Sequence, residues 1–267
     1  HVATLRKLPR EVVAATGLFM DGDLDAAEPL VRSFLLQHGN EVEAMRLLAR
    51  IGVARKVFDD AELLLAAVLE VAPDYRVARA EYAEVLIELQ KYSQARRELD
   101  RLLREDPANS PHYQGLHAVT AVGLGEHERA VALYRDLIAA APGDADLHLS
   151  LAHALKTLGR RDEAIESYRR AESCRPGFGD AYWSLANLKT YRFTAEELTR
   201  LKALQTAPEI AVIDRYHLHF ALGKALEDRG EFADSFHYYE LGNALRRSKS
   251  NYRPEIIENN TRLQIEV

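Results

Sequence analysis

Four prolines recur at an almost constant interval along this chain. Pro73, Pro107, Pro142 and Pro176 lie 34, 35 and 34 residues apart. One alanine stands 24 residues before each proline and a second stands 12 residues before it. Three positions that stay in phase through four segments predict a helix-turn-helix repeat of about 34 residues. Each repeat in such an array packs only on its neighbours. The length of 267 residues therefore indicates how many repeats the chain contains, rather than how many domains.

The recurring alanines predict where the two helices of each repeat cross, because a small side chain lets two backbones approach. We call them the first-helix alanines (Ala49, Ala83, Ala118, Ala152) and the second-helix alanines (Ala61, Ala95, Ala130, Ala164). One period earlier, Ala15 and Ala27 hold these positions, and Gly39 replaces the proline, where it can end a helix in a left-handed conformation. Large residues stand eight positions before each proline and are predicted to lie in the core: Leu65, Leu99, Tyr134 and Tyr168.

The period predicts an all-α fold, a right-handed superhelical solenoid of about seven units with a C-terminal capping helix. Five regular units are expected over 8–178 and a seventh over 216–249. Between them, 179–215 predicts an irregular sixth unit with a helix over 180–191, a second over 194–205 and a longer connection. Thr194 and Glu197 form the pattern of a capping box. Residues 250–267 are expected to form the capping helix, or a linker toward a further domain.

Composition narrows the class of protein. The formal net charge is −6, which disfavours nucleic acid as a general partner, and the cations at Arg246, Arg247, Lys249 and Arg253 are typical of a solvated helix end. No segment reaches the roughly 20 apolar residues that span a bilayer. Cys174 is the only cysteine, which favours a reducing, cytoplasmic location. The chain begins with His1 rather than methionine, so we expect residues to precede it.

No enzyme signature is found. Gly17 and Gly22 have the spacing of a phosphate-binding loop, but Asp23 follows where a lysine is needed. His217 and His219 lie on nearly opposite sides of a helix and are not expected to share a metal. Glu196 and Glu197 complement the positive end of a helix. The sequence therefore predicts no catalytic, metal or cofactor residues.

The first helix of each unit is expected to line the concave surface of the solenoid. In the second to fourth units, the residues counted onto this surface are Arg46, Arg50, Val53, Val77, Ala80, Glu84, Ile87, His112, Gly115, Val119 and Val122. The C-terminal half is aromatic and amide-bearing and carries a cation, which suits an extended peptide or a packed partner segment. The candidate contacts are His112, His153, Lys156, Trp183, Asn187, Tyr191, His217, Phe220 and Lys224. Trp183 is the only tryptophan, and two interpretations stay open: a filler between units, or a ligand contact.

The repeat resembles the tetratricopeptide repeat. Three stretches resemble, more specifically, the N-terminal half of bacterial tetratricopeptide-repeat sulfotransferases: AYWSLANLKTYRF (181–193), LHFALGKALED (218–228) and GNALRR (242–247). The resemblance implies a catalytic domain after the repeats that uses 3′-phosphoadenosine-5′-phosphosulfate (PAPS), held partly by a glycine- and serine-bearing loop after a strand. The chain ends at Val267, about where that domain would begin, so no donor-binding residue is carried over and the cofactor is implied only for the missing part.

The expected function is a non-catalytic scaffold for a peptide or protein segment, or for its own catalytic domain, in a parent sulfotransferase. The alternative is a free-standing adaptor that mediates protein–protein interaction or self-association.

Overall fold

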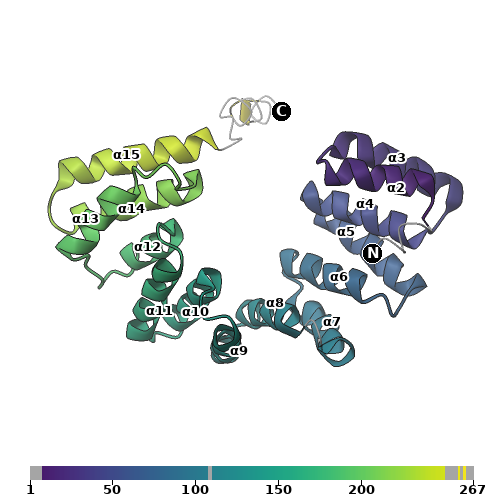
Figure 1. Cartoon of the computed structure of the whole chain (residues 1–267), viewed down its shortest axis with the longest axis horizontal. Helices are drawn as coiled ribbons and strands as arrows, with labels where there is room; N and C mark the ends of the chain where they lie inside the picture. The colour runs from purple at the N-terminus through teal and green to yellow at the C-terminus, as the bar shows by residue number, and fades with distance from the viewer. Residues whose placement is uncertain (1–7, 108–109, 250–257, 259–260, 263–267) are drawn as a thin grey trace. The chain divides into compact units, whose positions relative to one another are not determined.

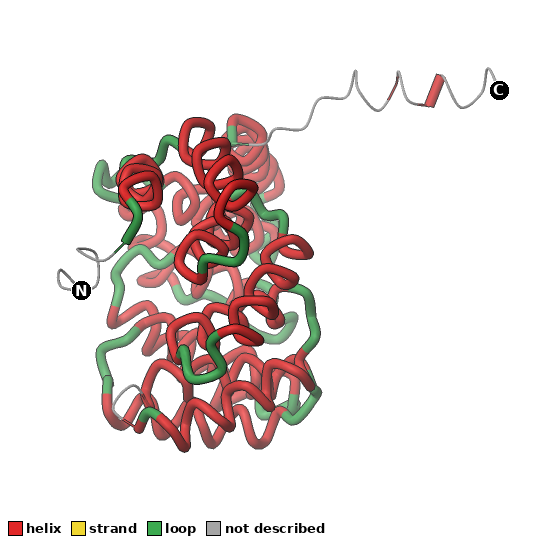
Figure 2. Tube along the Cα trace, turned by 90° about the vertical axis from the view of Figure 1, so that its right-hand side faces the viewer, coloured by secondary structure: helices red, strands yellow, loops and turns green. Residues whose placement is uncertain are grey.

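The structure is a computed structural model that describes residues 8–107, 110–249, 258, 261 and 262. All regular structure in these residues is helical, with no strand (Figures 1 and 2). The helices follow one another as antiparallel pairs, and within each unit neighbouring pairs contact each other. The predicted all-α repeat array is therefore confirmed.

The helices group into two units, each described here by itself. Unit 1, residues 1–140, contains α2 (Arg10–Met20), α3 (Leu24–His38), α4 (Val42–Ala54), α5 (Phe58–Val71), α6 (Arg76–Glu88), α7 (Tyr92–Glu105), α8 (Ser110–Gly123) and α9 (His127–Ala140). Unit 2, residues 141–267, contains α10 (Ala145–Thr157), α11 (Arg161–Cys174), α12 (Gly179–Ala186), α13 (Ala195–Leu204), α14 (Val212–Glu227) and α15 (Phe232–Ser248).

The recurring alanines lie where the sequence predicts them. All ten, from Ala15 to Ala164, have no exposed surface. The large residues eight positions before each proline are also buried, and Tyr168 is among the largest fully buried side chains. In unit 1 the core forms successive clusters, each shared by three consecutive helices, such as the one around Ala61 and Leu65 of α5. Burial of these apolar faces against neighbouring pairs stabilises the array.

The turn inside every helix pair except α12–α13 contains one residue with positive φ. Gly125 and Gly159 hold this position with φ of 75°, while Lys56 (61°) and Gln90 (57°) hold it in two other pairs. Gly39, which follows α3, also has positive φ (72°), although its ψ of −142° lies outside the left-handed helical region. Gly39 ends α3 as predicted, but the predicted left-handed conformation is wrong.

The irregular part of unit 2 differs from the sequence prediction in one helix. The predicted helix over 180–191 is wrong beyond Ala186, because the Asn187 amide closes α12 on the Trp183 and Leu185 carbonyls and the chain then turns. The predicted capping box is confirmed: Thr194 Oγ1 accepts from the Glu197 amide at 3.2 Å, and the Glu197 carboxylate accepts from the Thr194 amide at 2.9 Å.

Two carboxylates fasten α13 to the preceding helices. Glu172 of α11 accepts hydrogen bonds from the Tyr182 hydroxyl (2.5 Å) and from Arg200 of α13 (2.8 Å). Glu197 of α13 accepts from the Tyr191 hydroxyl (2.6 Å) and from Arg169 of α11 (3.2 Å). Charge-assisted bonds of this kind hold the short α13 in place despite its small buried face.

The predicted capping helix at 250–267 lies outside the described residues, apart from 258, 261 and 262.

Candidate functional site

Unit 1 carries a groove of about 840 Å³ whose walls come mainly from the first helices of its pairs. It is lined from α2 by Phe19, from α4 and the turn after it by Arg50, Val53, Ala54 and Lys56, from α5 by Phe58 and Leu65, from α6 by Glu81, Glu84, Val85, Ile87 and Glu88, and from α8 by Leu116 and Val119. We call this set the unit 1 groove. A volume of this size is within the range of ligand pockets in proteins.

The lining of the groove includes solvent-exposed aliphatic side chains. Val53 is 38% exposed and Val119 is 41% exposed, and Ile87 on α6 is partly exposed. Leu65 and Val85 belong to the core and close the lining from below. Aliphatic surface that remains open to water is available to a partner, since covering it contributes about 25 cal/mol per Å².

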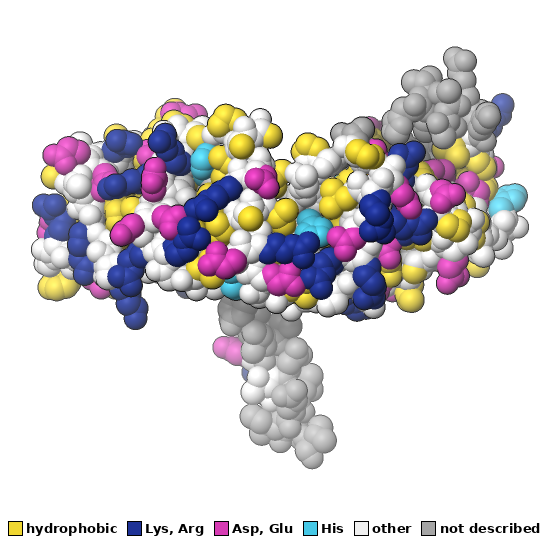
Figure 3. Space-filling view, turned by 90° about the horizontal axis from the view of Figure 1, so that it is seen from below, with side chains coloured by type: hydrophobic (Ala, Val, Ile, Leu, Met, Phe, Trp, Pro, Cys, Tyr) yellow, Lys and Arg dark blue, Asp and Glu magenta, His cyan; other side chains and the backbone are white. Residues whose placement is uncertain are grey.

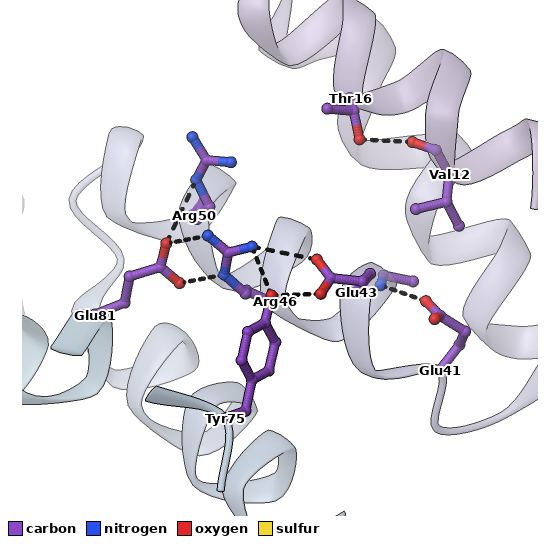
Figure 4. A network of polar contacts seen from close by, with 9 residues as sticks. Val12, Thr16, Glu41, Glu43, Arg46, Arg50, Tyr75 and Glu81 are labelled. Carbon is purple, nitrogen blue, oxygen red and sulfur yellow. Dashed lines mark hydrogen bonds and ion pairs between the residues drawn. The ribbon is translucent and has the colours of Figure 1, made fainter. Parts of the chain in front are cut away.

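A polar network beside the groove fixes α4 against α6 (Figure 4). Arg46 Nε and Nη2 donate to the two carboxylate oxygens of Glu81, both at 2.7 Å. Arg46 also donates to Glu43 (3.2 Å) and to the Tyr75 hydroxyl (3.0 Å), which in turn donates to Glu43. Burial, together with this bond to Glu43, raises the pKa of Tyr75 to about 12. The Tyr75 hydroxyl therefore stays protonated and neutral. Both carboxylate oxygens of Glu81 accept hydrogen bonds from Arg46.

Arg50 lies one turn further along α4 and is held differently. Its guanidinium lies 4.5 Å from the centroid of the Phe19 ring, a cation–π contact with α2. Its Nε also forms a long ion pair with the Glu81 carboxylate, at 3.9 Å, which is beyond hydrogen-bonding distance (Figure 4). No described residue accepts a hydrogen bond from Arg50, and its side chain is 35% exposed. The Phe19 ring and the long ion pair with Glu81 together hold Arg50, while its N–H donors form no hydrogen bond with a described residue.

The part of the groove lining that comes from α6 is acidic. Glu84 of α6 pairs with His112 of α8 at 3.3 Å, and burial raises the pKa of the Glu84 carboxyl above its usual value. Glu88, one turn further along α6, is exposed and forms no ion pair with the described residues. His112 is thus placed beside the groove, by its contact with Glu84.

In unit 2 the structure brings some of the candidate residues together. The rings of Trp183 on α12 and Phe220 on α14 have centroids 5.5 Å apart, and Tyr216 lies 6.0 Å from Phe220. Trp183 also packs on the buried cluster of α12, α13 and α14, yet stays partly exposed. Lys224 pairs with Asp228, the residue that follows α14, and, at 3.6 Å, with Glu227. Its charge is therefore compensated at the C-terminal end of α14.

The other candidate residues of unit 2 are more scattered. His153 lies on α10 with its Nδ1 3.0 Å from the Tyr168 hydroxyl, and burial lowers its pKa. Lys156 and Asn187 are exposed. Tyr191 lies beyond the end of α12, where its buried hydroxyl binds Glu197. His217 is partly buried on α14, and its Nδ1 has no partner among the described residues.

His219, two positions after His217, is buried with its Nε2 3.1 Å from Gln205 Oε1. In the described part of the chain, no group of three or more His, Cys, Asp or Glu side chains is placed to hold a metal ion. No helix described here has the length and apolarity needed to cross a membrane. Lysine and arginine side chains are interspersed with aspartate and glutamate over the face drawn in Figure 3.

Five of the residues predicted to lie on the concave surface line the unit 1 groove: Arg50, Val53, Glu84, Ile87 and Val119. The sequence prediction instead placed most of the candidate ligand contacts in the C-terminal half, because aromatic residues are concentrated there. The residues it missed are Phe19, Lys56, Phe58 and Leu65, together with Ala54, Glu81, Val85, Glu88 and Leu116. The prediction counted positions on first helices only, so it could not identify the lining residues that lie on turns and second helices.

Comparison with known proteins identifies the repeat. A family model described as tetratricopeptide repeat matches residues 53–119 and 121–188, just over half of the chain. A search of curated proteins finds no match.

Solved structures share the fold at low sequence identity. YrrB, described as a tetratricopeptide-repeat protein with an unusual peptide-binding site, aligns with a TM-score of 0.57 and 16% identity, covering 65% of this chain and 89% of YrrB. MamA AMB-1 aligns with a TM-score of 0.57 and 20% identity (63% and 99% covered). MamA from Desulfovibrio magneticus RS-1 aligns with a TM-score of 0.57 and 14% identity (62% and 96% covered). At these identities the likeness concerns the fold alone. Phased alanines, antiparallel helix pairs and the family match together show that the chain belongs to the tetratricopeptide-repeat family.

Proposed function

We propose that this protein is a non-catalytic adaptor that binds an extended segment of a partner protein in the unit 1 groove. The observation that carries the proposal is the groove itself: about 840 Å³, with exposed valines on two helices and charged side chains around them. Apolar pockets rimmed by a few fixed polar groups are the usual form of a peptide site. The description of YrrB as a peptide-binding repeat protein agrees with this proposal.

The proposal is tested by selection from a library of random peptides displayed on phage against the immobilised 267-residue protein. We expect enrichment of peptides with apolar side chains. Binding of the best peptide is then measured by fluorescence polarisation with wild type and with the double variant Val53→Asp, Val119→Asp. The double variant is expected to bind at least about tenfold more weakly, because two charged groups would lose hydration when the peptide covers them.

Val13→Asp is the matched control. Val13 is 40% exposed, close to the 41% of Val119, but it lies on α2 outside the groove lining. Equal weakening by the control and the double variant would show that binding occurs elsewhere. Absence of any enriched peptide on a helical, monodisperse protein would refute the proposal.

The sulfotransferase interpretation remains a hypothesis that rests on the resemblance of 181–193, 218–228 and 242–247 alone, and none of the comparisons adds support to it. Titration calorimetry of the chain with the sulfonate donor tests the non-catalytic reading: donor binding in the micromolar range would overturn it. Self-association is the other role proposed for an adaptor. Analytical ultracentrifugation tests it, because the sedimentation coefficient of a self-associating protein increases with protein concentration.

A further inference from the structure

The charged groups of the unit 1 groove are separated by sign. The cations Arg50 and Lys56 come from α4 and the turn that follows it. The carboxylates of Glu84 and Glu88 come from α6, and Val53 on α4, Ile87 on α6 and Val119 on α8 supply aliphatic lining alongside them. A third carboxylate, Glu81 of α6, is bound at both oxygens by Arg46 and also forms the 3.9 Å ion pair with Arg50. The groove therefore offers a ligand two poles of opposite charge and apolar lining.

The positive pole is prepared for a carboxylate. Arg50 is held by the Phe19 ring and by a 3.9 Å ion pair with Glu81, and its donors make no hydrogen bond to a described residue, so a closer pair with a ligand carboxylate needs little reorganisation. Its planar guanidinium donates to a carboxylate through two parallel hydrogen bonds, which Lys56 on the same lining can reinforce electrostatically. The groove lining extends beyond Arg50 to Phe19 of α2, so a bound segment could continue along the groove past Arg50. We therefore assign the carboxylate to an acidic side chain rather than to a chain terminus.

The negative pole suits a basic side chain. Glu88 is exposed and unpaired among the described residues, and Glu84 has only the His112 imidazole, itself 55% exposed, as a partner. A lysine or arginine of the ligand would place a full positive charge between two carboxylates one helical turn apart on α6. Complementary charges at both poles select partners and fix their direction more than they add affinity.

We propose that the groove selects a partner segment in which an acidic and a basic side chain flank apolar ones, with the acid on Arg50 and the base on Glu84 and Glu88. This inference rests on the proposed function and adds the charge pattern of the ligand.

The experiment uses the same phage selection, in which the peptide's C-terminus is fused and carries no free carboxylate. We expect enriched peptides to carry an acid and a base separated by apolar residues. The best peptide, synthesised with an amidated C-terminus, should bind Arg50→Glu at least about tenfold more weakly than wild type. Replacing its acidic residue by lysine should restore binding to Arg50→Glu and weaken binding to wild type. The double variant Glu84→Lys, Glu88→Lys should show the reciprocal behaviour toward the basic residue.

Arg97→Glu is the matched control, because Arg97 is exposed in the middle of α7 and outside the groove lining, and the charge change is the same. Circular dichroism confirms that each variant is folded. Enriched apolar peptides without an ordered pair of charges, or an Arg50→Glu variant that binds as wild type does, would overturn the charge pattern and leave the proposed function standing. Failure to enrich any peptide would remove both.

Discussion

Among single residues, two non-glycine side chains hold a backbone conformation that glycine adopts most easily. Lys56 and Gln90 have φ of 61° and 57° at the turn within a helix pair, where other pairs have glycine. The left-handed conformation costs a non-glycine residue roughly 1–2 kcal/mol. The alanine period reveals where this turn lies, but it does not reveal φ, because Lys and Gln carry no turn signal. The surrounding helices impose the conformation.

Gln90→Gly is expected to stabilise the protein. Relief of the left-handed strain exceeds the extra backbone entropy of glycine in the unfolded chain, for a net gain of about 0.5–1 kcal/mol. Urea unfolding followed by circular dichroism measures it. Ser93→Gly, which also introduces a glycine but lies within α7, should destabilise instead. A loss of stability in Gln90→Gly would mean that its side chain contributes more than the strain costs.

Gly179→Ala is expected to destabilise unit 2 by about 1–3 kcal/mol, the usual cost of overpacking. A methyl group at Gly179 would overlap the backbone of Asp214, whose carboxylate also accepts from the Gly179 amide at 2.9 Å. Gly115→Ala is the contrast, because a methyl group there meets nothing within 4 Å and α8 gains helix propensity. Thermal unfolding of the two variants should shift the melting temperature in opposite directions.

Whole elements follow the sequence closely where the period is regular and less closely where it slips. The alanine period places the helices of the regular repeats, since one small residue per helix determines how close a pair can pack. In the irregular region, the sequence of 187–191 has no glycine or proline to mark the end of α12, so a longer helix is the natural prediction. The turn there depends on tertiary contacts, among them the bond from Tyr191 to Glu197.

The histidines of α14 are expected to make stability depend on pH. Burial lowers the pKa of both His217 and His219, so each binds a proton less readily in the folded chain than in the unfolded one. Their contribution is complete above the pKa of an unfolded histidine, about 6.5, and is lost as the pH falls below it. Urea midpoints between pH 7.5 and about 5 should therefore decrease.

His219→Gln tests the source of this effect, because glutamine can still bond to Gln205 but does not titrate. The variant should show a smaller decrease between the same pH values than wild type. An unchanged pH dependence would assign the effect to other groups.

At the scale of the whole molecule, the main helix contacts within each unit join neighbouring helices and helix pairs, so stability is expected to be local. The unit 1 groove illustrates this, since all of its lining comes from α2 to α8 and the segments joining them. Sequence reasoning identified the repeat family from periodicity, and five of the residues it assigned to the concave surface line the unit 1 groove. It did not identify which part of the array holds the open groove, because that depends on how side chains fill the space between helices.

Residues 1–140 produced alone are expected to fold and to bind the selected peptide with an affinity within about threefold of the full chain, since additivity holds for independent parts. Helicity by circular dichroism and fluorescence polarisation measure the two properties. A shorter fragment, residues 1–105, lacks α8 with Leu116 and Val119 and should lose most of the binding. A 1–140 fragment without helicity would show that the units depend on each other.

The ten enclosed alanines have a consequence for how such proteins diverge in evolution. The pairing of the helices is constrained at these few positions, where any larger side chain would force the backbones apart. The outer faces carry no such packing constraint. Solved structures that share only 14% to 20% of their residues with this chain have the same fold, as expected if a few positions determine how the helices pair.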